Sequence, residues 1–216
     1  MKEDILIFGG NSFLAKAFNE KYKDVYAIQN VYRNDQTQQL NFDFESDDTQ
    51  SISNKLNGNF KAVLFFQGLN PSVGAKDIGP EHFSRMLKIN LITPTLLIKN
   101  LAGKLSEGAL VLFISSVAKK KGSYDPAYGS AKAGLIGLMH SLANAYHQLR
   151  FNVVSLGLVE NSPVFNNMTE DFRQKHVQRM FNGEFVKVED VVSAVAELIN
   201  NQSINRTDIE IDGGYN

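Results

Sequence analysis

Short apolar runs alternate along this sequence with longer stretches whose apolar residues recur at helical spacing. The runs are rich in Val, Ile and Phe and most carry no charge, which is typical of strands buried on both faces. They lie at Ile5–Phe8, Val25–Ile28, Val63–Phe66, Leu110–Ile114, Val153–Leu156 and Ile209–Ile211. The helical stretches lie at Phe13–Tyr22, Pro80–Leu105, Ala127–Arg150 and Val188–Asn200. The alternation predicts an α/β fold: a doubly wound parallel sheet with helices on both faces.

Composition limits the class of protein further. The chain has 216 residues, 43% of them hydrophobic, and no linker or repeat divides it, so we expect residues 1–216 to form a single domain. It has no cysteine, which excludes a disulfide scaffold, a zinc–thiolate site and a thiol nucleophile. Its net charge of −1 gives no reason to expect nucleic acid or an anionic membrane as a partner. The apolar runs are too short to span a bilayer and the N-terminus is unlike a secretory signal, so we expect a cytoplasmic protein.

Sheets of this kind bind ligands beyond the carboxyl ends of their strands. The first run is followed there by Gly9-Gly10-Asn11-Ser12-Phe13-Leu14-Ala15. A strand, a turn of small residues and the start of a helix are typical of a loop that binds the phosphates of a dinucleotide. Ala15 stands where a third glycine is usual, but the middle glycine is missing, with Ser12 or Phe13 in its place. A plain turn after a buried strand fits these residues equally well.

The fourth run ends in two hydroxyls, Ser115 and Ser116, and the next helical stretch contains Tyr128-Gly129-Ser130-Ala131-Lys132. Residues four apart share one face of a helix, so the Lys132 ammonium can lie near the Tyr128 phenol. A cation beside the phenol lowers its pKa from the ordinary value of about 10 and makes it a usable general acid and base. A serine hydroxyl at the strand end can polarise a substrate carbonyl.

In this order and over nearly the full chain, these residues resemble the short-chain dehydrogenase/reductase family. Four further segments resemble family motifs: Phe65–Gly68, where the family usually has Asn-Asn-Ala-Gly, Lys88–Asn90, Asn152–Gly157 and Ile211–Tyr215. The resemblance implies a Rossmann-type fold, a nicotinamide cofactor and an oxidoreductase that interconverts a ketone and a secondary alcohol. It also implies four catalytic residues: Asn90, Ser116, Tyr128 and Lys132.

The family assigns each of these residues a role. Tyr128 exchanges a proton with the substrate oxygen, Ser116 holds that oxygen, and Lys132 binds the cofactor ribose and lowers the Tyr128 pKa. Asn90 serves a water-mediated proton relay, although an amide within an apolar helix can also be a brace to the backbone. The interval from Ser116 to Tyr128 is one residue shorter than usual, which leaves Ser115 as an alternative hydroxyl.

The resemblance also implies a set of residues that contact the cofactor. They are Gly9, Asn11, Ser12, Phe13, Leu14, Arg33, Asp43, Phe44, Gln67, Gly68, Asn90, Tyr128, Lys132, Gly157 and Val159. Asp43 follows an expected third strand, Leu40–Phe42, and would contact the adenine ring; a plain turn aspartate is the alternative. No carboxylate ends the second strand, whereas Arg33 can accept a 2′-phosphate, so we expect NADP(H) to be slightly favoured over NAD(H).

The expected partner is a small carbonyl or alcohol substrate. The stretch from Leu158 to Val186 should form its lid, and the run Lys119–Lys121 can meet a phosphate-bearing or carrier-linked substrate or be a solvated loop. The four histidines, His82, His140, His147 and His176, lack metal-ligand spacing and are expected at the surface or in packing. By resemblance, the two long helices also predict a homodimer or homotetramer.

Two departures from the family pattern support a different function: the missing central glycine and the Phe65–Phe66 pair in place of two asparagines. A third departure, Leu156 in place of a proline, lies beside the expected nicotinamide position. The alternative is a non-catalytic or weakly catalytic dinucleotide-binding protein with a regulatory or scaffolding role.

Overall fold

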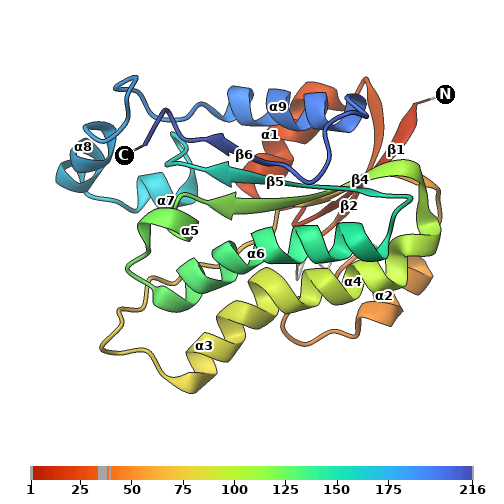
Figure 1. Ribbon diagram of the computed structural model, residues 1–216, viewed down its shortest axis with the longest axis horizontal. Helices are drawn as coiled ribbons and strands as arrows, with labels where there is room; N and C mark the ends of the chain where they lie inside the picture. Colours follow the sequence, from red (N-terminus) through yellow and green to blue (C-terminus); the bar gives the residue numbers. More distant parts are fainter. Residues whose placement is uncertain (1, 34–37, 39, 216) are drawn as a thin grey trace.

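The computed structural model describes residues 2–33, 38 and 40–215. Its strands form one six-stranded sheet in the order β2-β1-β3-β4-β5-β6, and every neighbouring pair is parallel (Figure 1). The bounds of the strands are β1 Glu3–Phe8, β2 Tyr26–Val31, β3 Phe60–Phe65, β4 Leu105–Ser116, β5 Arg150–Leu156 and β6 Asp208–Ile211. Each of the six predicted apolar runs therefore lies within or directly overlaps a strand, and the predicted parallel sheet is confirmed.

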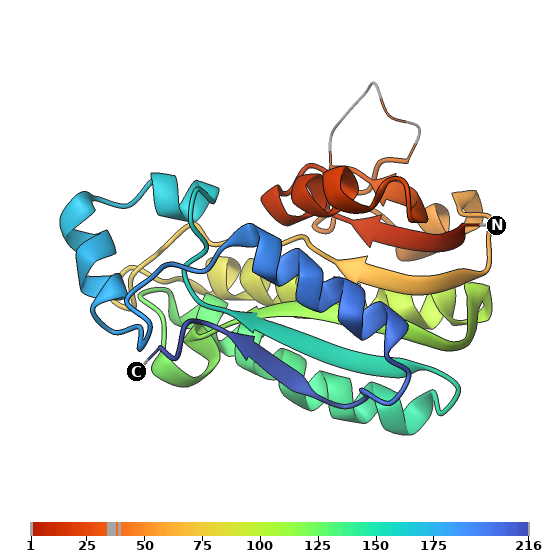
Figure 2. The same cartoon turned by 90° about the horizontal axis from the view of Figure 1, so that it is seen from above.

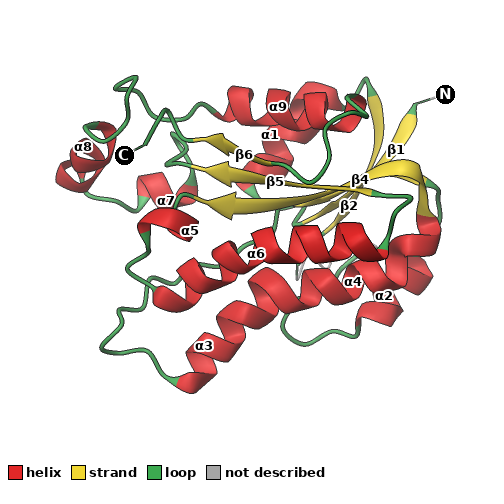
Figure 3. Ribbon diagram, in the orientation of Figure 1, coloured by secondary structure: helices red, strands yellow, loops and turns green. Residues whose placement is uncertain are grey.

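Helices cover both faces of the sheet, as Figure 2 shows from above. One face carries α1 (Phe13–Tyr22) and α9 (Val188–Asn200), which pack together. The opposite face carries α2 (Thr49–Lys55), α3 (Pro80–Leu87), α4 (Thr93–Leu101) and α6 (Pro126–Ala145). Three short helices lie near the carboxyl ends of the later strands: α5 (Ala118–Lys121), α7 (Pro163–Asn166) and α8 (Glu170–Val177) (Figure 3).

Aromatic side chains on neighbouring strands form the centre of the core. Phe8, Phe65 and Phe113 lie side by side in register on β1, β3 and β4, and their rings stack at 5.2 Å between successive centroids. The residues before them, Ile7 and Leu64, point to the other face, toward α1 and α9. Both faces of these strands are buried, which is why the runs have no charge.

The predicted third strand, Leu40–Phe42, is wrong as a strand. Asn41 makes a single parallel bridge to Tyr32, held by the bonds Tyr32 N–H to Leu40 O and Phe42 N–H to Tyr32 O. The chain returns to the edge of β2 after only a few residues, so it gains one bridge rather than a ladder. Most of the connecting segment lies outside the described residues.

The predicted long helix from Pro80 is interrupted. A π-helical turn, η1 (Lys88–Ile92), separates α3 from α4, and a 3₁₀ turn, η2 (Ala102–Lys104), ends the stretch before β4 begins at Leu105. Pro94 has no N–H for the carbonyl of Asn90 and its ring crowds that carbonyl, which widens the turn here. The proline therefore places Asn90 in a turn of unusual geometry.

The next predicted helix is shorter than expected at its carboxyl end. α6 ends at Ala145, and Arg150 is the first residue of β5. The buried Arg150 guanidinium donates to carbonyls at the end of α9, those of Leu198, Ile199, Asn201 and Ile204. A cation there complements the negative end of the helix. Across the described ranges, no helix is both long and apolar enough to cross a membrane.

Candidate functional site

The predicted serine, tyrosine and lysine meet at the carboxyl end of β4. Ser116 ends that strand, and Tyr128 and Lys132 lie on the first turns of α6. The Ser116 hydroxyl lies close enough to the Tyr128 phenol to act on its pKa. The Lys132 ammonium lies 5.6 Å from the centre of the Tyr128 ring and donates to the Ile114 carbonyl at 2.8 Å. A hydroxyl, a phenol and an ammonium therefore converge where a parallel sheet binds its ligands.

Burial dominates the electrostatics of this group. It raises the pKa of Tyr128 above its ordinary value, and the hydrogen bond with Ser116 acts in the opposite direction. Burial also lowers the pKa of Lys132, which is 4% exposed, to about 8. The prediction of a net fall in the Tyr128 pKa is therefore wrong for the protein alone, because loss of water around the phenol outweighs its neighbours.

The two candidate serines have different surroundings. The Ser115 hydroxyl is buried and donates to the Lys132 carbonyl at 2.9 Å, so it joins β4 to α6. The Ser116 hydroxyl accepts from the Ala118 N–H at 3.2 Å and reaches Tyr128. Only the second hydroxyl is beside the phenol.

Asn90 lies in the π-helical turn with its amide turned to the segment after β3. It is 2% exposed, and its Nδ2 donates to the carbonyls of Leu69 and Met86 at 3.2 and 3.1 Å. Its Oδ1 accepts from the Leu69 N–H at 3.4 Å. A Cβ at Gly68 would stand 3.6 Å from Asn90 Oδ1 and 3.7 Å from Lys132 Nζ. Asn90 thus braces the backbone and also faces the space beside Lys132.

The predicted phosphate loop makes a tight approach to the segment after β3. Gly9 has φ +86°, and a Cβ there would lie 2.6 Å from the Gln67 backbone nitrogen. A Cβ at Gly10 would lie 2.8 Å from the Tyr32 ring. Ser12 is the N-cap of α1, and its hydroxyl accepts from the Ala15 N–H at 3.1 Å. Only glycine permits this turn and this contact between main chains.

A small pocket of about 50 Å³ lies beside this loop. Six of its lining residues belong to the predicted cofactor set: Gly9, Arg33, Asp43, Phe44, Gln67 and Gly68. Four others were not predicted: Tyr32, Phe42, Leu69 and Ile89. Tyr32 and Phe42 lie where the chain returns to the edge of β2. They directly precede Arg33 and Asp43 in the sequence, and this adjacency to two predicted cofactor residues could have identified them.

Arg33 is half exposed at the rim of this pocket and faces two carboxylates. Its guanidinium lies 3.5 Å from Asp43 and 3.8 Å from Glu45, and Arg85 binds the same Glu45 at 2.9 Å. Asp43 also accepts from the Glu45 N–H, as a turn aspartate does. The interactions of Arg33 are long ones at an exposed position, so the guanidinium can turn to another anion.

Comparison with known proteins identifies the family to which the chain belongs. Residues 22–216 match the family model described as enoyl-(acyl carrier protein) reductase. The chain belongs to the short-chain dehydrogenase/reductase family. A carbonyl reductase family member 4 from Xenopus laevis is 29% identical over 171 residues, 76% of this chain and 70% of that protein. The 3-oxoacyl-(acyl-carrier-protein) reductase FabG of Rickettsia felis is 26% identical over 219 residues, 97% of this chain and 85% of the relative. A small-chain dehydrogenase solved with NADPH has a TM-score of 0.85 at 19% identity, covering 99% of this chain and 98% of that one.

Several residues of this member of an oxidoreductase family provide groups that suit a nicotinamide dinucleotide. Gly9 and Gly68 provide backbone that a side chain would obstruct, and the N-terminus of α1 follows the loop. Gln67 Oε1 is a buried acceptor for which the described residues provide no donor. Lys132 provides a buried cation next to Gly68. These residues fit such a cofactor.

Other predicted cofactor residues lie apart from the small pocket. Asn11, Ser12, Phe13 and Leu14 form the turn into α1 and are not among the lining residues. Gly157 and Val159 follow β5, two strands away, where Gly157 N–H bonds the Ile211 carbonyl and Val159 pairs with Val186. The Val159 side chain is buried in the core on the α1 and α9 face.

The Phe65–Phe66 pair, a departure from the family pattern, has a plain structural account. Phe65 stacks between Phe8 and Phe113, and Phe66 packs on Phe18 at 6.1 Å, so both rings are core residues. They do not fill the small pocket. The Phe65–Phe66 pair therefore gives no support to a non-catalytic role.

The lysine run is mostly bound to the sheet. Lys119, whose side chain is 4% exposed, pairs with Asp208 and Glu210 of β6, and Lys120 pairs with Glu210. Both earlier interpretations, a phosphate-binding run and a solvated loop, are wrong for Lys119. Its carboxylate partners lie far along the chain, so no local pattern could predict these ion pairs.

Sequence reasoning missed Asp125, which is fully buried three residues before Tyr128. It is the N-cap of α6 and accepts from the N–H groups of Ala127 and Tyr128 at 3.0 and 3.1 Å. It also accepts from Val73 N–H at 3.3 Å and is bonded to His82 Nε2 at 2.8 Å. An aspartate before Pro126 is an N-terminal helix signal that could have revealed the cap.

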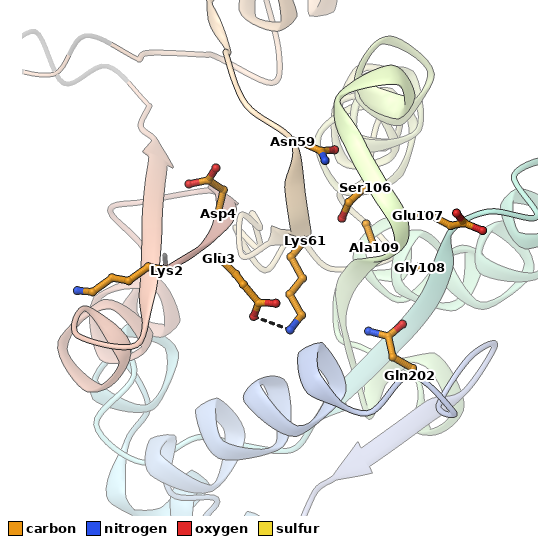
Figure 4. Close-up of a pocket in the computed structure, with 10 residues that line it drawn as sticks. All are labelled: Lys2, Glu3, Asp4, Asn59, Lys61, Ser106, Glu107, Gly108, Ala109 and Gln202. Carbon is orange, nitrogen blue, oxygen red and sulfur yellow. Dashed lines mark hydrogen bonds and ion pairs between the residues drawn. The ribbon is translucent and has the colours of Figure 1, made fainter.

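A larger cavity of about 460 Å³ lies at the opposite, amino end of the sheet (Figure 4). Its lining includes Glu3 of β1 and Lys61 of β3, which pair with each other, and Ser106 of β4, which donates to the Phe60 carbonyl. None of the lining residues has a buried side-chain polar atom without a hydrogen-bond partner. Among the described residues, no group of three or more His, Asp or Glu side chains has the arrangement of a metal site.

Proposed function

We propose that the protein is an NAD(P)(H)-dependent oxidoreductase that interconverts a ketone and a secondary alcohol. The observation that carries the proposal is the convergence of Ser116, Tyr128 and Lys132 at the carboxyl end of β4, beside a glycine-lined pocket. The names of two relatives, a carbonyl reductase and a 3-oxoacyl-(acyl-carrier-protein) reductase, agree with this chemistry. In this account residues 1–216 act as one catalytic domain.

Each residue does a distinct task. Ser116 donates a hydrogen bond to the substrate oxygen and holds it beside the Tyr128 phenol, which gives the oxygen a proton in the reductive direction. Lys132 stays largely protonated at neutral pH, because its pKa is about 8, and its charge stabilises the phenolate left behind. Asn90 holds the Leu69 segment in place and presents its amide near Lys132, as a proton relay requires. The bound nicotinamide supplies or accepts the hydride.

Tyr128→Phe tests the catalytic role. The phenyl ring keeps the packing of Tyr128 and removes its proton, so turnover should fall by about 10²–10⁴-fold with cofactor affinity little changed. The assay is NADPH oxidation over a panel of ketones, with nicotinamide fluorescence to measure binding. A Tyr128→Phe variant that turns over like the wild type would refute the catalytic role. A wild type that binds the cofactor but reduces nothing would instead support a binding protein.

We also propose that the cofactor is NADP(H), slightly preferred over NAD(H). The half-exposed Arg33 at the pocket rim supports this, because a 2′-phosphate can take the place of its two long carboxylate interactions. The competing carboxylates explain why the preference is modest. Separate titrations with NADPH and NADH measure it, and a preference for NADH would overturn it.

The proposed substrate is a small carbonyl compound, with a carrier-linked acyl group as the specific candidate. FabG, one of the relatives, is named for a carrier-linked substrate. Lys120 and Lys121 are the exposed members of their run, and Phe172 and Phe181 expose apolar rings on and after α8. Activity on a 3-oxoacyl thioester compared with simple ketones decides between the two kinds of substrate.

We further propose that the protein is a cytoplasmic homo-oligomer. Phe83, Ile92 and Leu96 expose apolar side chains along the stretch from α3 to α4, which lies beside α6 on one face of the molecule (Figure 1). Burying them between two copies removes this surface from water. Light scattering of the purified protein tests the proposal, and a monomeric mass contradicts it.

A further inference from the structure

Gln67 has an unusual side chain for its position. It is the second residue after β3, and its Oε1 is shielded from solvent without a hydrogen-bond donor in the described part of the chain. Nearly all buried polar atoms in folded proteins have a partner, and leaving an acceptor unpaired lowers the stability of the fold. The protein therefore keeps an acceptor here at a cost.

The neighbours of Gln67 indicate what this acceptor is for. Its backbone nitrogen meets Gly9 of the phosphate loop, since a Cβ on Gly9 would come within 2.6 Å of it. The residue lines the small pocket together with Arg33, Asp43 and Phe44. On its other side Gly68 leads to Asn90 and Lys132. Gln67 thus stands between the phosphate loop and the small pocket, which we assign to the adenosine half of the cofactor because Arg33, the proposed contact of the 2′-phosphate, lies at its rim.

We propose that the Gln67 amide oxygen accepts a hydrogen bond from a ribose hydroxyl of the adenosine half of the dinucleotide. This inference rests on the proposed function and adds a specific anchor to it. Ribose hydroxyls are the donors that this half of the cofactor brings between its phosphates and its base. The terminal amide turns about a soft side-chain bond, so the oxygen can reach the pocket without a change in the backbone. The family usually has Ala here, so the contact is a property of this chain.

The proposal predicts two effects of one substitution at Gln67: the free protein keeps or gains stability, and the complex loses affinity for the cofactor. Gln67→Met keeps the length of the side chain and removes the amide. In the free protein it removes an unpaired acceptor, so the melting temperature should stay the same or rise. In the complex it removes a hydrogen bond, so the affinity for NADPH should fall by about 5- to 20-fold. A residue with a purely structural role would lower the melting temperature.

Three probes locate the contact. Binding of NADPH, ADP-ribose and reduced nicotinamide mononucleotide is measured by fluorescence or calorimetry on wild type and variant. The first two contain the adenosine half and should lose affinity by the same factor, whereas the mononucleotide should be unaffected. Gln202→Met, the same substitution at an exposed glutamine beside the amino-end cavity, is the matched control and should change nothing. Gln67→Ala, which has the family's residue, is the second variant and should show the same loss of affinity for NADPH and ADP-ribose.

The outcomes separate this inference from the proposed function. Equal ADP-ribose affinity in wild type, Gln67→Met and Gln67→Ala overturns the inference and leaves the proposed function intact. A parallel loss of stability in the free protein, or an equal loss for the mononucleotide, also overturns it. If the wild type binds neither NADPH nor ADP-ribose, both the proposed function and the inference fail.

Discussion

The two ends of the sheet differ in how their polar groups are satisfied. At the amino end the cavity is large, about 460 Å³, and none of the residues that line it has a buried side-chain polar atom without a partner; Lys61, for example, pairs with Glu3. At the carboxyl end the pocket is small, about 50 Å³, but it is lined by glycine backbone and by Gln67, whose oxygen has no partner in the described chain. Unsatisfied groups, rather than volume, identify the end that is built for a ligand.

The direction of the strands explains this difference. All six strands are parallel, so helices that follow them begin at the carboxyl end of the sheet. Ser12 caps α1 there and Asp125 caps α6, and the free N–H groups of such helix starts attract anions. The amino end receives helix carboxyl termini, and at α9 Arg150 already satisfies the carbonyls.

The largest expected effect comes from Gly9→Ala. The added Cβ would lie 2.6 Å from the Gln67 nitrogen, and φ +86° is costly for alanine. We expect at least a tenfold loss of NADPH affinity and a stability loss of about 1–3 kcal/mol. Calorimetry and urea unfolding measure both. Gly103→Ala is the control, because a Cβ at Gly103 meets nothing within 4 Å. Wild-type affinity in Gly9→Ala would show that this turn does not approach the ligand.

A smaller effect is expected from the charge of Lys132. Burial lowers its pKa to about 8, so the ammonium is present at pH 7 and is lost as the pH rises through 8. An anionic cofactor should therefore bind several-fold more weakly at pH 9.5 than at pH 7. Lys132→Met should bind weakly at both values, and its affinity should not follow this titration. The same pH dependence in wild type and Lys132→Met would contradict the assignment.

Lysine burial also predicts a change in stability. Burial of the Lys132 ammonium lowers the free energy of unfolding, and this cost is complete below pH 8, where the lysine is protonated in the folded protein. The cost shrinks as the pH rises from 8 toward the ordinary lysine pKa of about 10.4, because the folded protein loses the proton first. Lys132→Met should therefore stabilise the free protein at pH 7. Urea unfolding of the wild type and Lys132→Met at pH 7 and pH 9.5 measures this gain in the free energy of unfolding, which should be smaller at pH 9.5.

The last expected effect, on stability alone, concerns Asp125. Burial by itself raises the pKa of this carboxyl, but hydrogen bonds from Tyr128 N–H, His82 and Val73 N–H give a net fall. Its ionised form therefore stabilises the fold above the ordinary aspartate pKa of about 3.9, and this contribution is lost as the pH falls through the lowered value. Asp125→Asn turns an NH₂ group toward the Val73 and His82 donors, and should cost about 1–3 kcal/mol at pH 7.

Urea unfolding at pH 7 and pH 3 checks this prediction. The difference between wild type and Asp125→Asn should be smaller at pH 3. Asp48→Asn, at the exposed N-cap of α2, is the control and should cost little, since asparagine caps a helix about as well as aspartate. An equal difference at both pH values would show that the Asp125 charge is not what stabilises this junction.

The sequence predicted those parts of the molecule that depend on local pattern. The six strands and the bounds of α1 and α9 follow from apolar periodicity, and the approach of Tyr128 and Lys132 follows from the helix repeat. Contacts between distant segments had no such signal. His82 and Asp125 are 43 positions apart, and Lys119 and Asp208 are 89 apart.

The sequence also could not predict properties that depend on how much water the fold removes around a group. The spacing of Tyr128 and Lys132 predicted a lowered tyrosine pKa, but the sign depends on how much water the fold removes. The unpaired oxygen of Gln67 is likewise visible only once every neighbour is in place.

The most direct test of the account is a fluorescence titration with NADPH of three proteins: the wild type, Gly9→Ala at the carboxyl end and Lys61→Ala at the amino end. We expect the wild type and Lys61→Ala to bind with the same affinity and Gly9→Ala to bind at least tenfold more weakly. Loss of binding in Lys61→Ala with wild-type binding in Gly9→Ala would show that the cofactor binds at the amino end of the sheet and would contradict our account. Failure of the wild type to bind either NADPH or NADH would contradict the account altogether.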